Sequence, residues 1–337
     1  MKMQLLICGL ALLALGGMKP SDDVQRFDRV VEPFVAAFND SNYEALRADW
    51  NQTMREELPL ARTKSFFGGV RNKRGTVEEM GRGRIRQANT CVFPLKFSDG
   101  SDMELKVVLD RADRIAGLWI RPPTPDLPVP ERNCTALSLP FQGWWYVTWG
   151  GDTKELNRHH DVINQRYAFD FLVVDEEGSS HSGAGDKNEE YYAFGKEILP
   201  PARGRVTEVI SGVHDCEPGT MNSYSALGNV VFIRHRPHEV SVLAHLKQGS
   251  IRVKAGQKVE RGEVIGLCGN SGNSSEPHLH YHLQNTPRIE EATGIKCYLQ
   301  NVRVRSGGET REAHSHSPER KEQVAPQGKK NPTAGDA

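Results

Sequence analysis

Apolar residues in the first part of the chain follow a helical spacing. Between residues 24 and 38 they fall on one stripe of a helix, and charged residues occupy the other positions. Pro33 interrupts this stripe and is expected to kink or restart the helix. A second helical stretch is expected over residues 43–58.

Beyond residue 100 the pattern changes to a strand spacing. Met103, Leu105, Val107 and Leu109 alternate with polar residues, and residues 115–120 form a second apolar run. Helices followed by strands predict an α+β domain over residues 21–121. This order loosely resembles SnoaL-type domains, and the resemblance implies a cystatin-like cone. No catalytic set of residues is evident there, so a structural or wall-targeting module is expected.

Composition divides the rest of the chain. Closely spaced prolines predict an extended linker over residues 122–139. Residues 305–337 contain almost nothing apolar and are expected to form a disordered tail. Residues 1–17 combine Lys2 with a short apolar run too brief to span a bilayer, which is typical of a cleaved secretion signal.

Charge and cysteine content narrow the function classes. The chain has 337 residues and a formal net charge of zero, so two domains are expected and nucleic acid is not an expected partner. No later segment is apolar enough to cross a membrane. Five cysteines would remain after cleavage, and this odd number means that at least one thiol is free or pairs between chains. None forms a C-x-x-C pair, so a cysteine zinc site is not expected.

Histidines mark the candidate chemistry. In a strand over residues 277–283, His278, His280 and His282 would share one face, and the residues between them would face a core. His245 occupies a similar strand upstream. Imidazoles aligned in this way suit a zinc site, although three solvated histidines on a half-exposed strand would give the same spacing.

Six ordered segments stand out between residues 201 and 283: Pro201–Val206, Gly228–Val231, Ala244–Leu246, the expected hairpin over residues 253–266, Gly269–Gly272 and His278–His280. Together these segments resemble the core of LytM/lysostaphin-type zinc peptidases. The resemblance implies an all-β, mainly antiparallel peptidase domain over residues 140–304, with a narrow groove over the sheet.

The resemblance also assigns roles to residues. His280 inherits a zinc-ligand role, and His245 and His278 inherit roles in catalysis. Asp170 matches the acidic ligand, but Arg166 stands where the family usually has a histidine. A variant branch places Asn-x-His before a Gln-Arg-Tyr-Ala-x-Asp segment, which makes His159 the expected third ligand. The neighbouring His160 is the alternate.

Together these features predict a secreted or periplasmic zinc metalloendopeptidase of the cell envelope. Its expected cofactor is Zn²⁺, and its expected substrate is a peptidoglycan peptide or another extracellular peptide, cut by metal-activated water. A non-catalytic module that binds the wall or regulates a wall hydrolase is the alternative. Trp144, Trp145 and Trp149 could line a groove or pack in the core, and Arg166 could bind a substrate carboxylate or pair with Asp161. The oligomeric state stays open.

Overall fold

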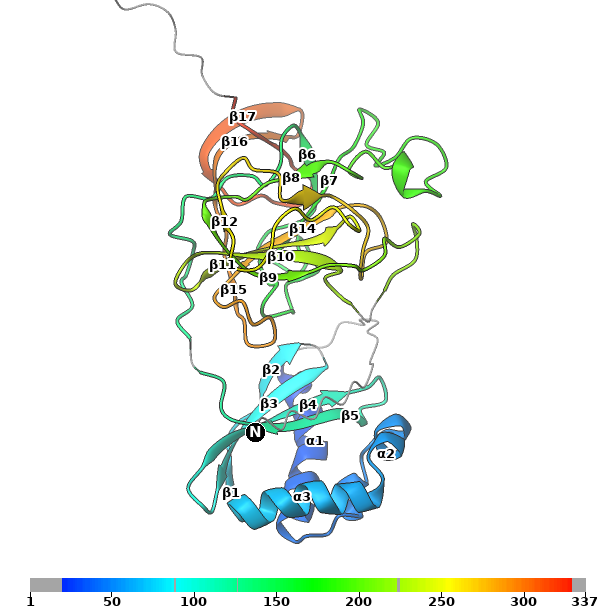
Figure 1. Ribbon diagram of the computed structural model, residues 1–337, viewed down its shortest axis with the longest axis vertical. Coiled ribbons are helices and arrows are strands. Elements are labelled where there is room, and N and C mark those ends of the chain that lie inside the picture. Colours follow the sequence, from blue (N-terminus) through cyan, green and yellow to red (C-terminus); the bar gives the residue numbers. More distant parts are fainter. Residues whose placement is uncertain (1–19, 88, 126, 223–224, 329–337) are drawn as a thin grey trace, which may run out of the picture. The chain divides into compact units, whose positions relative to one another are not determined.

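A computed structural model describes residues 20–87, 89–125, 127–222 and 225–328. Contacts divide the chain into two units, Met1–Asp126 and Leu127–Ala337, each with its own hydrophobic core (Figure 1). The secretion signal predicted over residues 1–17 lies outside the described residues. Among the described helices, none has the length and apolar character needed to cross a membrane.

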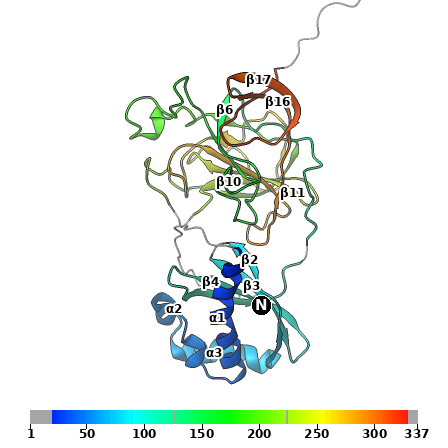
Figure 2. The same ribbon diagram turned by 180° about the vertical axis from the view of Figure 1, so that it is seen from behind.

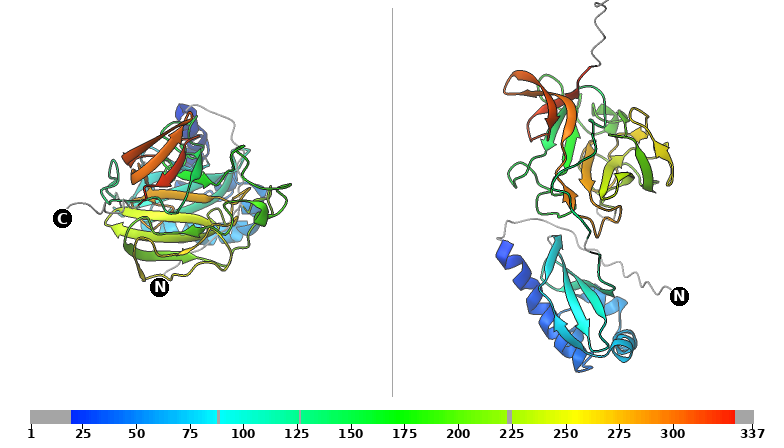
Figure 3. Two further views of the ribbon diagram at one scale, coloured as in Figure 1. Left: turned by 90° about the horizontal axis from the view of Figure 1, so that it is seen from above. Right: turned by 90° about the vertical axis from the view of Figure 1, so that its left-hand side faces the viewer.

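The first unit packs helices against an antiparallel sheet. The sheet order is β1-β3-β4-β5, and β2 pairs with β3. Figures 2 and 3 show α1 running along one face of this sheet. The elements are α1 (Pro20–Asn39), η1 (Ala45–Arg47), α2 (Gln52–Glu57), α3 (Leu60–Arg74), β1 (Val77–Met80), β2 (Arg84–Gln87), β3 (Thr90–Phe97), β4 (Asp102–Leu109) and β5 (Ile115–Arg121).

The helix α1 continues through Pro33 and does not restart there, whereas the expected kink stays a prediction. Phe27 and Val31 before the proline and Phe34 and Phe38 after it are all buried in the same core. Burial of one continuous apolar stripe offsets the hydrogen bond that proline cannot donate within the helix. The predicted strands correspond to β4 and β5.

The helix expected over residues 43–58 is wrong as a single element. It is divided into η1 and α2, because Trp50 between them forms a bridge with Ile115 at the start of β5. The side chain of Asn51 then caps α2 by accepting a hydrogen bond from the Met54 amide at 2.8 Å. The cystatin-like description of this unit stays a prediction.

The second unit is built on an 11-stranded sheet with the order β12-β9-β10-β11-β14-β7-β6-β18-β16-β17, to which β15 adds beside β14. All its pairs of named strands are antiparallel, as predicted, and Figure 3 shows the central strands side by side. A second, two-stranded sheet pairs β13 with β8. The elements are β6 (Trp145–Trp149), β7 (Phe169–Leu172), η2 (Asn188–Glu190), β8 (Glu197–Ile198), β9 (Gly204–Ile210), β10 (Asn229–Arg236), β11 (Glu239–Leu246), β12 (Lys258–Val259), β13 (Gly266–Leu267), β14 (Leu279–Gln284), β15 (Gly294–Ile295), β16 (Leu299–Ser306), β17 (Glu309–His316) and β18 (Gln323–Pro326).

The peptidase domain predicted over residues 140–304 is too short at both ends. The tail expected to be disordered from residue 305 instead forms the end of β16, then β17 and β18, and its described part ends at residue 328. Val324 is fully buried, and β18 lies between β6 and β16. The expected linker over residues 122–139 is also partly folded, because Leu137 and Leu139 are buried in the core of the second unit. In the C-terminal segment, pairing of β16, β17 and β18 satisfies the polar groups of the backbone. This segment is therefore ordered with few apolar side chains.

The hairpin expected over residues 253–266 is wrong. Strand β12 pairs with β9 and strand β13 pairs with β8, so the two short strands belong to different sheets. Each strand is only two residues long, and each pairs with a strand that precedes residue 211. All five described cysteines carry free thiols, and Cys91, Cys268 and Cys297 are buried.

Candidate metal centre and active site

Two neighbouring strands bring an acid and a histidine into contact. Asp170 on β7 lies directly opposite His280 on β14 in the strand register. Residues opposite each other in an antiparallel pair share a face. The Asp170 Oδ1 atom lies 2.8 Å from Nδ1 of His280, and both residues are buried.

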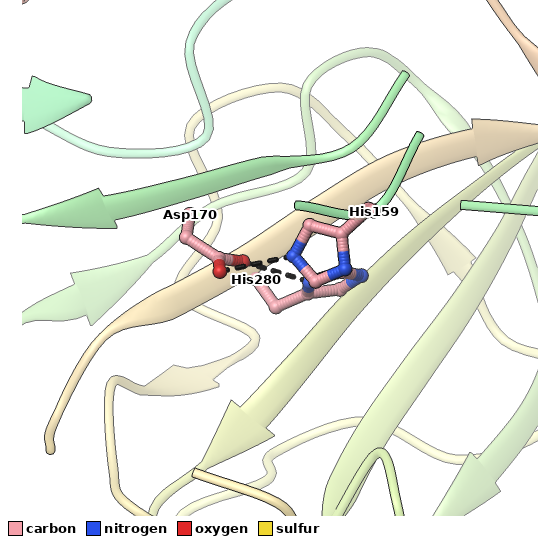
Figure 4. Close-up of side chains that lie close together, drawn as sticks. All are labelled: His159, Asp170 and His280. Atoms are coloured by element: carbon pink, nitrogen blue, oxygen red, sulfur yellow. Dashed lines mark hydrogen bonds and ion pairs between the residues drawn. The ribbon is translucent and has the colours of Figure 1, made fainter. Parts of the chain in front are cut away.

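A folded-back loop adds His159 to this pair. His159 Nε2 lies 3.0 Å from Asp170 Oδ2, and Figure 4 shows both imidazoles turned toward the carboxylate. Asn157 holds the loop from inside. Its side-chain amide donates to the carbonyl oxygens of Gly151, Arg166 and Ala168, and its carbonyl oxygen accepts from the His159 amide.

The alternate histidine points elsewhere. His160 is partly exposed, and its Nδ1 lies 3.2 Å from an oxygen of its neighbour Asp161. Ligand-capable atoms of His159, Asp170 and His280 all lie within 4.8 Å of one another. The structure therefore brings together the three residues predicted as ligands and leaves His160 outside the cluster.

A row of hydrogen bonds along β14 fixes the proton on His280. The Thr286 carbonyl can only accept, so the Gln284 amide donates to it at 2.7 Å and turns its own oxygen toward His282 Nε2 at 2.9 Å. His282 must then donate from Nε2, which leaves its Nδ1 as the acceptor for His280 Nε2 at 3.0 Å. The remaining nitrogen of His280, Nδ1, carries a lone pair toward Asp170.

The charges around Asp170 and His280 fit a cation. Burial would raise the pKa of Asp170, but the charge and the hydrogen bond of His159 hold it well below its usual range. Burial lowers the pKa of His280 to about 4, so this imidazole is neutral at neutral pH. A carboxylate and an imidazole lone pair thus face each other at 2.8 Å, an arrangement that a shared cation stabilises. Two histidines and one carboxylate are the donor set of catalytic zinc sites, which keep a further position open.

The role of His282 leads to a testable prediction. In a His282→Leu protein the proton of His280 loses its acceptor, and zinc affinity is expected to fall by about 10–100-fold, the usual cost of losing an outer-shell partner. His282→Gln should restore much of the affinity, because its amide can accept from His280 and donate to Gln284. Competitive titration with a zinc-binding dye measures both, and equal affinities of the Leu and Gln variants would contradict the role.

Two further histidines border the cluster without joining it. His278 donates from Nδ1 to the carbonyl of Glu276 at 2.8 Å, so its Nε2 carries the lone pair. That Nε2 is buried, has no hydrogen-bond partner in the described structure and lies 3.7 Å from Asp170 Oδ1. His245 donates from Nδ1 to the Ser271 carbonyl, and its ring centre lies 4.7 Å from that of His278. Both rings are thus anchored through Nδ1, which leaves Nε2 as the second nitrogen of each ring beside the candidate metal centre.

The backbone at His245 is unusual. Its φ is +60°, a left-handed value uncommon outside glycine, and it falls in a bulge where β11 leaves register with β10. Hydrogen bonds to the Leu227 carbonyl and from the Gly269 amide hold this conformation. Burial keeps the pKa of His245 well below its usual range. Bulges next to active sites commonly re-aim one side chain, and here the bulge turns a neutral imidazole to the site.

Other residues singled out in the sequence have mainly structural contacts. Trp145 is buried and stacks on Phe141, while Trp144 lies against Arg303 and Arg305, and Trp149 against Arg320. Arg166 donates to the backbone carbonyl of His160 at 3.1 Å. The sequence reading missed Arg158, whose half-exposed guanidinium lies 3.3 Å from Asp170 Oδ2.

Comparison with known proteins gives a family match for part of the second unit. Residues 191–291 match the family model described as Peptidase family M23. The chain contains an M23 peptidase domain. The matched range contains three of the five residues of the candidate site: His245, His278 and His280. The other two, His159 and Asp170, precede it.

Curated relatives support the assignment of the M23 domain. The chain is 50% identical over 56 residues to the peptidoglycan DD-endopeptidase ShyA of Vibrio cholerae, covering 17% of this chain and 13% of that protein. It is 34% identical over 70 residues to the cell division protein DipM of Caulobacter vibrioides, covering 21% and 11%. The matches therefore span less than a fifth of the length of either relative.

Two solved structures are similar to parts of the chain at low identity and low TM-score. A zinc-containing peptidase from Vibrio cholerae shares 20% identity with a TM-score of 0.30, covering 61% of this chain and 49% of that chain. The catalytic domain of lysostaphin from Staphylococcus simulans shares 18% identity with a TM-score of 0.27, covering 45% and 88%.

Proposed function

We propose that the M23 domain is a zinc-dependent endopeptidase that hydrolyses amide bonds in the peptide part of peptidoglycan. The observation that carries the proposal is the cluster of His159, Asp170 and His280, with the free nitrogens of His245 and His278 beside it. A peptidase assignment alone does not name the substrate. The peptidoglycan substrate is supported by relatives such as the V. cholerae peptidoglycan DD-endopeptidase.

In this proposal His159, Asp170 and His280 hold the zinc, which would polarise the substrate carbonyl and lower the pKa of water. The chain's own residues then move protons. His278 and His245 are each anchored through Nδ1 to a backbone carbonyl, so each keeps its Nε2 lone pair in place for a proton. The imidazolium formed can stabilise the developing oxyanion or protonate the leaving nitrogen.

The proposal places the enzyme in the cell envelope or outside the cell. That location is where peptidoglycan is found, and it agrees with the secretion signal predicted over residues 1–17. The loop that Asn157 anchors supplies the third proposed ligand, His159. This ligand lies about ten residues before Asp170 in the sequence and does not come from the strand that carries Asp170.

Digestion of purified peptidoglycan tests the proposal. Zinc-loaded protein should generate new free amino groups without new reducing sugar ends, as measured by mass spectrometry of the soluble products. A chelator should abolish the release and added zinc should restore it. If zinc-loaded protein binds walls of several cross-link types but releases no peptide from any of them, the domain is a non-catalytic wall-binding module instead.

A further inference from the structure

A basic cavity lies at the end of the second unit's sheet that is remote from the histidine cluster. It is open to solvent, has a volume of about 870 Å³ and is lined in part by the start of β9, the end of β10 and the start of β11. Val240 lines the cavity while His245 borders the metal centre, and five residues of strand separate them by about 17 Å at about 3.3–3.4 Å per residue. The cavity is therefore distinct from the proposed active site.

The lining carries a large excess of positive charge. Six basic side chains contribute to it, and Glu260 is its only acidic residue within the described structure. The basic residues are Arg203, Arg205, Arg234, Arg236, Lys258 and Arg288.

Three of these cations stand in a row across adjacent strands. Lys258 on β12 lies opposite Arg205 on β9, and Arg205 lies opposite Arg234 on β10. All three are exposed and therefore share the solvent face of the sheet edge. Like charges placed directly opposite one another destabilise a sheet, so the row costs folding free energy when nothing compensates it.

The protein itself supplies little compensation. Within the described residues, Arg288 pairs with Glu291, whereas no carboxylate lies within ion-pair distance of the other five cations of the lining. Arg205 has one neutral partner, the carbonyl oxygen of Gly256, at 2.6 Å. The guanidinium groups therefore keep most of their donors for an external acceptor.

The floor of the cavity is held by hydrogen bonds. His235 lies between Arg234 and Arg236 and donates from Nδ1 to the carbonyl of Arg203 at 2.9 Å, while its Nε2 accepts from Ser241 at 2.8 Å. Gly204 allows β9 and β10 to lie close together at this point, because a Cβ there would lie 2.5 Å from Ile233 and 3.0 Å from the His235 ring. The backbone that carries the arginines is thus fixed before any ligand arrives.

We propose that this cavity is a binding site for a ligand with two or more phosphate groups. Guanidinium groups match phosphate oxygens through paired hydrogen bonds, and several unpaired cations around one hollow require more negative charge than a single carboxylate carries. The volume suits a small molecule or one segment of a polymer.

Calorimetric titration of the full chain with tripolyphosphate at low salt tests the proposal. The wild type should bind, and the double variant Arg205→Gln/Arg234→Gln should bind at least tenfold more weakly. A matched control is Arg252→Gln/Lys254→Gln, which removes the same charge from exposed residues of this unit outside the lining. Repeating the titration in a His280→Ala background removes any contribution from phosphate contacting zinc.

Further measurements distinguish a free phosphate compound from a lipid headgroup, and phosphate from other anions. Citrate should bind more weakly than tripolyphosphate, and vesicles containing phosphatidylglycerol report whether a lipid headgroup can enter. In the absence of ligand, the Arg205/Arg234 variant should melt at the same temperature as the wild type or higher, because repulsion is relieved. Equal losses in the two double variants, no binding of tripolyphosphate, or binding to vesicles alone would each overturn the proposal.

Discussion

A protein carrying His280→Ala is expected to lose its bound zinc and, with it, all measurable wall hydrolysis. His280 contributes one of only two imidazoles in the cluster, and its Nδ1 lone pair is held toward Asp170 by the His282 hydrogen bond. The loss should exceed the 10–100-fold typical of outer-shell changes. Elemental analysis of purified protein and dye competition measure the occupancy and the affinity.

Variants of the adjacent pair provide the matched control. His159→Ala should lose zinc in the same way, whereas His160→Ala should keep it, because His160 contacts Asp161 outside the cluster. Circular dichroism should show an unchanged fold in all three proteins. Full zinc occupancy in the His280→Ala protein, or loss of zinc from the His160→Ala protein alone, would refute the ligand assignment.

Replacement of His278 or His245 by alanine should abolish hydrolysis while leaving zinc bound. Neither side chain belongs to the three-residue cluster, yet both border it and are anchored through Nδ1 to a backbone carbonyl. Loss of a general base costs about 10²–10⁴-fold in rate, and loss of an oxyanion donor about 10²–10³-fold. Initial rates of peptide release, measured at saturating zinc, give the size of the effect.

His314→Ala is the control for this pair, since His314 is exposed on β17 and its ring is hydrogen-bonded to Asn301. It should retain wild-type activity and zinc. Wild-type rates in both the His245→Ala and the His278→Ala proteins would remove these histidines from the mechanism. Loss of zinc from either would show that it supports the metal instead of acting on the substrate.

The face on which each side chain of β14 lies could be predicted from the sequence, because it depends only on the alternation of neighbouring residues. Alternation within His278–Leu283 decides which side chains share a face, and the structure places His278, His280 and His282 together, with Leu279 and Tyr281 in the core. The preference for His159 over His160 depended on a family spacing. The structure adds its physical basis, the buried Asn157 that ties the loop to the backbone on both sides of it.

Non-local pairing accounts for what the sequence did not reveal. The segment beyond residue 305 is polar, and only its contacts with distant strands β6 and β16 order it. The relay through His282 and Gln284 was also missed, because the direction of each hydrogen bond depends on the Thr286 carbonyl at its end. The helix α3 buries only Thr63 and Phe67 fully, so it leaves little periodic signal to detect.

The place of β18 in the sheet has a consequence for the order in which this protein can be completed. Its Val324 pairs with Trp145 on one side and with Val304 on the other, so β6 and β16 are joined through a strand that is synthesised long after β6. Until then β6 and β16 would present open edges, which invite pairing with other chains. Contacts so distant in sequence also form slowly. A chain cut before Gln323 would therefore carry every proposed catalytic residue and still lack the strand that closes the sheet beside them.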